Sequence, residues 1–155
     1  MKKLIILFIG FSLLSSCSKD DDNEPNNGSI VGEWRLSKLN TEMNIAEGVM
    51  KSIGEGKNYN AFMTFTEEPN QVTSKGSLTL VQTVYMGSTP LGTEEMPIDF
   101  SSYFGAGKWE LSGNTLTLSG QSSNVSVTIT KLTSNTLIFN YNPDVTTVLT
   151  FEFSK

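Results

Sequence analysis

Apolar and polar residues alternate along most of the chain after Ile30. A two-residue period is typical of strands that bury one face and expose the other, as in antiparallel sheets. The clearest alternating segments are Tyr59–Thr66, Leu78–Met86, Val125–Thr130, Leu137–Asn142 and Leu149–Ser154. The pattern therefore predicts an all-β domain over residues 30–155.

A tight hairpin is predicted around the Gly-Asn pair at positions 113–114, which suits a two-residue turn with positive φ angles. Such a turn places Leu111 opposite Leu116 and Trp109 opposite Leu118. All four side chains then share one face, so the hydrophobic pattern and the turn chemistry agree.

A second hairpin is expected around Ser134. A two-residue loop would pair Ile129 with Asn140, whereas a three-residue loop, Thr133–Asn135, pairs Ile129 with Phe139. Only the longer loop keeps the apolar face whole, so we expect that register.

Two segments depart from the strand pattern. Apolar residues recur at helical spacing in Thr41–Ile53, which predicts a short helix after the first strand. The segment Gly87–Gly107 contains Pro90 and Pro97 and is interpreted as a long connection. Its aromatic residues either close one end of the core or belong to a mobile lid over a cavity, because long loops in compact domains are often functional.

One six-residue motif occurs twice. Gly32–Ser37 nearly recurs as Gly107–Ser112, with Gly, Trp, Leu and Ser at the same spacing. The repeat indicates two strands in equivalent positions of one sheet. About eight strands fit the domain, and an up-and-down antiparallel β-barrel closes their edges economically. The predicted fold is therefore such a barrel, with the short helix after its first strand.

Composition narrows the chemistry. The 155 residues carry 11 Lys and Arg against 16 Asp and Glu, so the net charge is -5 and nucleic acid is not an expected partner. The chain has no histidine and a single cysteine. This removes the usual general base, Ser-His and Cys-His nucleophile pairs, an internal disulfide and Cys-rich metal sites. No cofactor or metal is expected.

Catalysis would need a pair of carboxylates at glycosidase spacing, such as two among Glu33, Asp99 and Glu110. The sequence gives no reason to place any two of them together, and charged residues that alternate on a strand ordinarily face solvent. We therefore expect a protein that is not an enzyme.

The N-terminus has the form of a secretory signal. Lys2 and Lys3 precede the eleven residues Leu4–Leu14, which are apolar except for Gly10 and Ser12. As a helix these residues would span about 16 Å, roughly half of the hydrocarbon core of a bilayer. A stable membrane span is therefore not expected.

The residues Leu14-Ser15-Ser16-Cys17 resemble the lipobox of bacterial lipoprotein signal peptides. The resemblance implies that residues 1–16 are removed and that Cys17 is acylated. Two or three acyl chains hold a protein stably on a membrane, whereas one binds only reversibly. The alternative is a plain secretory signal with a chance cysteine.

Residues 17–29 are polar and acidic, and we expect a flexible tether that holds the domain clear of the lipid headgroups. Lys19, Asp20, Asp21 and Asp22 resemble the export signal that carries lipoproteins of the Bacteroidetes group to the outer face of the outer membrane. The resemblance implies a lipid-anchored protein that faces the cell exterior; the other interpretation is a plain spacer. A calcium site at the aspartates is disfavoured, because calcium takes six to eight oxygens on a curved loop with a glycine.

The pair Gly32-x-Trp34 resembles the G-x-W motif that opens the first strand of lipocalins. Together with the 107–118 hairpin, the Thr128–Thr133 segment and the terminal Leu149–Phe153 strand, it makes residues 30–155 similar to the lipocalin-like lipoproteins of Bacteroidetes.

In lipocalins, an arginine near the last strand packs on the tryptophan of this motif. The only arginine here is Arg35, which follows Trp34 directly and therefore points to the other face. Lys131 or Lys155 would have to substitute for the arginine, or the contact is absent.

The resemblance implies a barrel that binds a small apolar or amphipathic ligand. Each candidate lining residue could instead be ordinary core. The candidates are Trp34, Met63, Phe65, Leu80, Trp109, Phe139 and Tyr141. The alternative function is a structural or accessory envelope lipoprotein, whose barrel is filled by its own side chains and which contacts another envelope protein through its outer face or the 87–107 segment.

Overall fold

Strands account for most of the chain that the computed structural model describes, residues 28–120 and 124–155. A 3-10 turn, η1 (Ala46–Gly48), and a short helix, α1 (Ser101–Phe104), interrupt them. The strands are β1 (Gly32–Ile45), β2 (Met50–Thr66), β3 (Gln71–Met86), β4 (Thr89–Asp99), β5 (Ala106–Ser112), β6 (Thr115–Gly120), β7 (Asn124–Leu132), β8 (Thr136–Tyr141) and β9 (Thr147–Ser154).

The strands form one antiparallel sheet in the order β2-β1-β9-β8-β7-β6-β5-β3-β4, and a further pairing of β2 with β3 closes a ring. The ring contains eight strands, because β4 lies outside it and pairs only with β3. Each strand of the ring pairs with its neighbour in the chain once β4 is set aside. The predicted all-β, up-and-down barrel of about eight strands is therefore confirmed.

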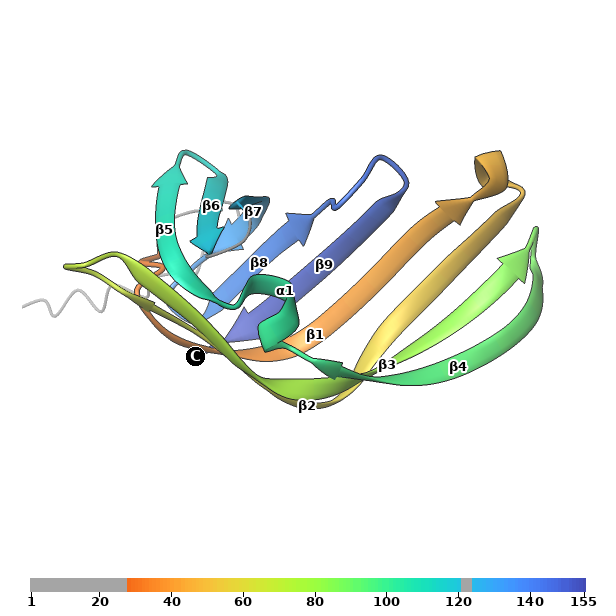
Figure 1. The fold of residues 1–155 in the computed structure, drawn as a ribbon, viewed down its shortest axis with the longest axis horizontal. Coiled ribbons are helices and arrows are strands. Elements are labelled where there is room, and N and C mark those ends of the chain that lie inside the picture. The colour runs from red at the N-terminus through yellow and green to blue at the C-terminus, as the bar shows by residue number, and fades with distance from the viewer. Residues whose placement is uncertain (1–27, 121–123) are drawn as a thin grey trace, which may run out of the picture.

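The edge of β3 is divided between two partners. Its first residues, 71–73, pair with β5, and residues 77–86 pair with β4. The barrel consequently closes at one end, while the far ends of β1 and β2 and the β3–β4 hairpin extend beyond it as a curved sheet (Figure 1). We call this extension, residues 41–45, 50–56, 80–86 and 89–96, the wing.

Aromatic rings fill the closed end of the barrel. The ring centroid of Phe151 lies 5.3 Å from those of Phe104 and Phe139, and 6.2 Å from that of Phe100. Phe153 lies against Phe139 on the same layer, with the two centroids 5.4 Å apart. All five rings are buried, so the interior at this end is occupied by protein side chains.

The predicted helix over Thr41–Ile53 is wrong. The segment is a strand, a three-residue 3-10 turn and a second strand, with Met43 opposite Ser52. A helix would pair its own backbone groups internally, but it would leave the facing edges of β3 and β9 without partners. The apolar residues at helical spacing do not share a buried face: Val49 and Ile53 are both exposed.

The interpretation of Gly87–Gly107 as a loop is also wrong, because most of it is β4, followed by α1. Pro90 and Pro97 are compatible with a strand here, since β4 is an edge strand and a proline there need not break a hydrogen-bonded ladder. The proposal that its aromatic residues close one end of the core is confirmed for Phe100 and Phe104, and the lid is not observed.

Both predicted hairpins are present. Leu111 lies opposite Leu116 and Trp109 opposite Leu118, as expected. Ile129 lies opposite Phe139, which is also the expected register. Between Ile129 and Lys131 a bulge shifts this second register by one residue. The expected pairing therefore holds at Phe139, but the pairing next to the turn differs from the one that a three-residue loop would give.

Replacing Phe151 with alanine should lower the free energy of unfolding by about 3–5 kcal/mol, because it leaves a cavity among closely packed rings. Urea unfolding followed by tryptophan fluorescence measures the loss. The matched control is Phe62→Ala: Phe62 is only half-buried, with the Lys75 ammonium 5.4 Å from its ring centroid. This control should lose about 1 kcal/mol or less. Equal losses would contradict a filled interior.

Candidate functional site

The closed end of the barrel is built around Trp34, the tryptophan of the Gly32-x-Trp34 motif. Its ring is fully buried, and its Nε1 donates a hydrogen bond to the carbonyl oxygen of Ile30 at 2.7 Å. The Lys155 Nζ lies 4.3 Å from the ring centroid and donates to the carbonyl oxygen of Val31 at 3.0 Å. Of the two candidates, Lys155 therefore supplies the cation on Trp34.

The seven predicted lining residues all belong to the hydrophobic core or pack against it. Trp34, Met63, Phe65, Leu80 and Phe139 are members of the buried core, and Trp109 and Tyr141 pack against it from partly buried positions. The Trp109 ring makes an edge contact with Phe65, and its Nε1 donates to the carbonyl oxygen of Thr66 at 2.8 Å. The structure brings these residues together as core, and none of them lines the groove described next.

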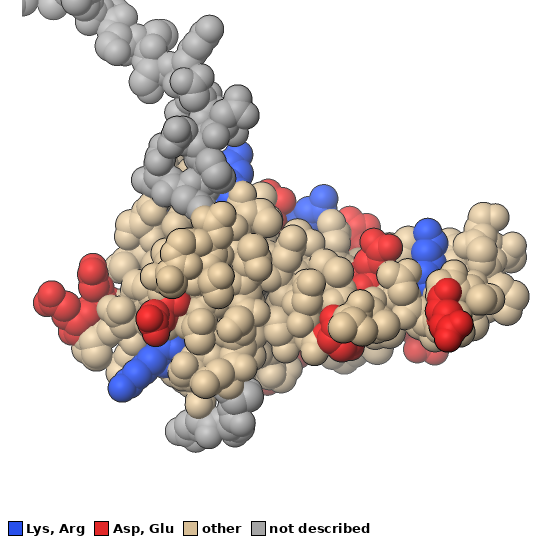
Figure 2. Space-filling view, turned by 90° about the horizontal axis from the view of Figure 1, so that it is seen from above, with Lys and Arg blue, Asp and Glu red and all other residues tan. Residues whose placement is uncertain are grey.

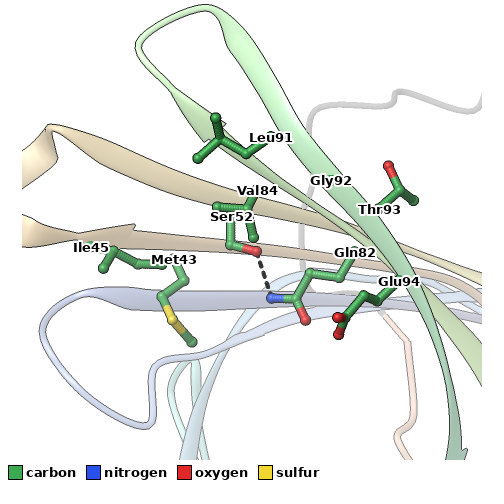
Figure 3. Close-up of a pocket in the computed structure, with 9 residues that line it drawn as sticks. All are labelled: Met43, Ile45, Ser52, Gln82, Val84, Leu91, Gly92, Thr93 and Glu94. Atoms are coloured by element: carbon green, nitrogen blue, oxygen red, sulfur yellow. Dashed lines mark hydrogen bonds between the residues drawn. The ribbon is translucent and has the colours of Figure 1, made fainter.

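A groove of about 420 Å³ lies on the concave side of the wing (Figure 3). Its volume falls within the usual range of about 300–1,000 Å³ for small-molecule sites. All four strands of the wing contribute to it. The lining residues are Met43, Ile45, Ser52, Gln82, Val84, Leu91, Gly92, Thr93 and Glu94.

Strand register explains why polar residues gather in the groove. Thr41 lies opposite Gly54, Gly54 opposite Gln82, and Gln82 opposite Glu94, so these four form one row across the wing. Opposite residues of paired strands point to the same side of a sheet, and Gln82 and Glu94 therefore both face the groove. The Gln82 Nε2 donates a hydrogen bond to Ser52 Oγ at 2.6 Å, which fixes the amide between the strands (Figure 3).

Two glycines of the wing have different surroundings. A Cβ on Gly54 would collide with the Thr41 hydroxyl and crowd the side chain of Leu80. Only glycine therefore fits between these two side chains. A Cβ on Gly92 would meet nothing within 4 Å, which shows that Gly92 faces open space. The Thr41 Oγ1 is itself buried and has no hydrogen-bond partner within the described part of the chain.

The carboxylates considered for catalysis have surface positions. Glu33 is exposed and forms an ion pair with Lys75 at 3.2 Å. Asp99 accepts hydrogen bonds from the backbone N–H and the hydroxyl of Ser101 at the start of α1. Glu110 is exposed on β5, and none of the three lines the groove.

The described residues contain neither a metal-binding cluster nor a membrane-spanning helix. No group of three or more His, Cys, Asp or Glu side chains within residues 28–120 and 124–155 could hold a metal ion. No helix in the same ranges is long and apolar enough to cross a membrane. Cys17, Lys19, Asp20, Asp21 and Asp22, the residues of the expected acylation site and export signal, lie outside the described residues.

Sequence reasoning missed the groove, although one signal was available. Gln82 stands between Leu80 and Val84 in the alternating segment Leu78–Met86, at a position where the pattern calls for an apolar residue. A polar side chain on the inward face of a strand indicates a hydrogen-bonded partner or a wet cavity. The position of Ser52 opposite Val84 could not be derived, because the segment that contains it was interpreted as a helix.

The geometry defines an eight-stranded antiparallel barrel with one end filled by aromatic side chains and a concave groove at the other. The family model of the lipocalin-like domain matches residues 30–139, and the chain belongs to this family. The comparison with curated proteins gives no significant match, and the comparison with solved structures gives none either. The predicted resemblance to lipocalin-like proteins is thereby confirmed for the domain.

Replacing Lys155 with glutamine should lower the free energy of unfolding by about 1–2 kcal/mol, because Trp34 loses its cation–π partner and Val31 loses a charged donor. Lys155→Arg should retain most of the stability, since a guanidinium also packs on an aromatic face. Thermal unfolding compares the two variants with Lys57→Gln, which removes the charge of an exposed lysine. A loss in Lys57→Gln as large as that in Lys155→Gln would show that only net charge matters.

Proposed function

We propose that this protein is a surface-tethered lipoprotein whose lipocalin-like barrel binds a small apolar or amphipathic ligand in the groove of the wing. The observation that carries the proposal is the groove itself: about 420 Å³, on the concave side of the sheet, at the end of the molecule that the aromatic core does not fill. Binding here leaves the packed core in place.

The lining of the groove has the mixture of side chains that amphipathic ligands require. Apolar side chains come from Met43, Ile45, Val84 and Leu91, and a few polar groups stand among them. Small-molecule sites are typically mostly apolar, with a small number of polar groups that fix orientation. Leu91 is 53% exposed, so apolar surface continues from the groove to its mouth.

The arrangement of the ends supports a tethered binding protein. The N–H of Gly28 donates to the carbonyl oxygen of Leu132 at 3.1 Å, so the described chain begins beside the β7–β8 turn. The wing projects from the opposite end of the molecule (Figure 1). If Cys17 carries the acyl anchor, a flexible tether of this length reaches roughly 20 Å and attaches at the closed end. The groove would then face away from the membrane.

The surface charge gives no support to a nucleic-acid partner. On the face shown in Figure 2, acidic and basic side chains are interspersed and no basic patch stands out. The net charge of -5 acts in the same direction, since it repels a polyanion. The partners we propose are the membrane, through the anchor, and a small ligand.

The accessory function is the second candidate, and the filled barrel favours it. Val49, Met86 and Leu91 expose apolar surface at the tip of the wing, where the N–H of Gly87 donates to the carbonyl oxygen of Val49 and joins the two turns. Such a tip could contact another envelope protein. The two functions differ in what occupies the groove.

Replacing Gly92 with tryptophan should abolish most ligand binding, because the new ring has open space to enter and fills the groove. We expect the affinity for a neutral amphiphile such as 1-decanol to fall at least tenfold, about 1.4 kcal/mol, by titration calorimetry. Val81→Trp is the matched control, since Val81 neighbours Gln82 on β3 and points to the opposite, convex side. Failure of the wild type to bind any amphiphile would favour the accessory function instead.

Replacing Cys17 with serine should leave the protein without acyl chains and release it from the membrane. Detergent phase partitioning measures the anchor, and protease added to intact cells measures exposure of the wild type at the surface. Ser18→Ala is the control, because it changes the neighbouring residue without removing the thiol. Partitioning of Cys17→Ser into the detergent phase would contradict the anchor.

A further inference from the structure

We propose that the groove selects amphiphiles with a protonated amine head group and rejects those with a carboxylate. This inference rests on the proposed function, because it assigns the ligand chemistry of the same groove. The ammonium would lie between Glu94, Gln82 and Ser52, with the alkyl chain along the apolar lining of the wing.

The polar part of the groove offers a carbonyl and a carboxylate acceptor to a ligand. The Gln82 amide nitrogen donates to Ser52, which leaves the Gln82 carbonyl oxygen to accept from a ligand. Figure 3 shows this amide and the Glu94 carboxylate close together within the groove. An ionised carboxylate accepts only, and an ammonium group supplies three donors and no acceptor. The two sets of groups are therefore complementary.

Glu94 is the only charged residue in the lining of the groove. The nearest lysine on β2, Lys51, belongs to the convex side, because it lies opposite Tyr85 and its Nζ sits 5.8 Å from the centroid of that ring. No lysine or arginine among the described residues lines the groove to neutralise a ligand carboxylate. A fatty acid would therefore bring a second negative charge beside Glu94 without a cation to pair it.

A second carboxylate, Asp144, lies in the β8–β9 connection, outside the lining of the groove. Asp144 Oδ2 accepts a hydrogen bond from the hydroxyl of Thr147, and Thr147 lies opposite Met43, which lines the groove. The hydroxyl of Thr146 donates to Asp144 Oδ1, and this bond holds the pKa of the Asp144 carboxyl below its ordinary value. A negative charge at Asp144 therefore adds to that of Glu94 in favouring a cation over an anion.

The test compares three ten-carbon amphiphiles that differ only in their head group: decylamine, 1-decanol and decanoate. Titration calorimetry at pH 7, below the critical micelle concentrations, should rank decylamine first and decanoate last, with at least a tenfold difference between them. Glu94→Gln should reduce that difference at least fivefold. The matched control is Glu95→Gln, which removes the same charge from the next residue; Glu95 lies opposite Val81 and faces the convex side.

The outcomes separate the two proposals. Binding of 1-decanol without a preference for decylamine over decanoate would overturn the head-group inference and leave the proposed function standing. An equal effect of Glu94→Gln and Glu95→Gln would also overturn it, because general surface charge would then explain the preference. Absence of binding by all three would overturn both. Gly92→Trp must weaken decylamine binding, or the amine binds elsewhere.

Discussion

The division of one strand edge governs the shape of this molecule. Residues 71–73 of β3 pair with β5, and residues 77–86 pair with β4. The same strand therefore belongs both to the eight-stranded ring and to the β3–β4 hairpin that extends beyond it. Because an edge can pair with only one strand at each position, β5 cannot continue along β3 once β4 is there. The closed barrel and the open wing are two consequences of this single exchange of partners.

The closed end of the barrel and the wing differ in the size of the side chains that point inward. At the closed end, inward positions carry large aromatic side chains such as Phe151 and Phe153, which leave no room for a ligand. On the wing the corresponding positions include Gly92 and Ser52, whose small side chains leave the groove open on the concave side. One strand pattern therefore supplies both a core and a groove, and the size of the inward residue decides which is formed.

The sequence predicted the parts of the fold in which local pattern and tertiary pairing agree. Trp109 and Leu118 were placed opposite each other correctly because turn chemistry and alternation gave the same register. The segment Thr41–Ile53 was mistaken for a helix because its apolar residues follow helical spacing, while the stabilising contacts come from strands distant in the chain. Tertiary pairing overrides such local signals, and no single-segment argument could detect it.

The groove of the wing was not predicted for the same reason, because it too depends on tertiary pairing. Each predicted lining residue was chosen for being large and apolar, and those properties place Trp34 and Phe139 in a packed core. The groove instead depends on small and polar residues at inward positions, and it exists only where the register places Gln82 beside Glu94. Alternation identifies which residues point inward, but it does not say whether the inward space is filled.

The free edge of β4 bears on how copies of the protein meet one another. An exposed strand edge can recruit a strand from a neighbouring molecule, and proteins commonly block such pairing with proline and charge. β4 carries Pro90 and Pro97, and between them the adjacent acids Glu94 and Glu95. If the proposed lipid anchor holds copies of the protein on one membrane, they will meet often. Two β4 edges would then repel each other through these acids, and the prolines would leave gaps in the row of N–H donors. The edge strand that opens the barrel thus carries the residue types with which proteins disfavour edge-to-edge pairing.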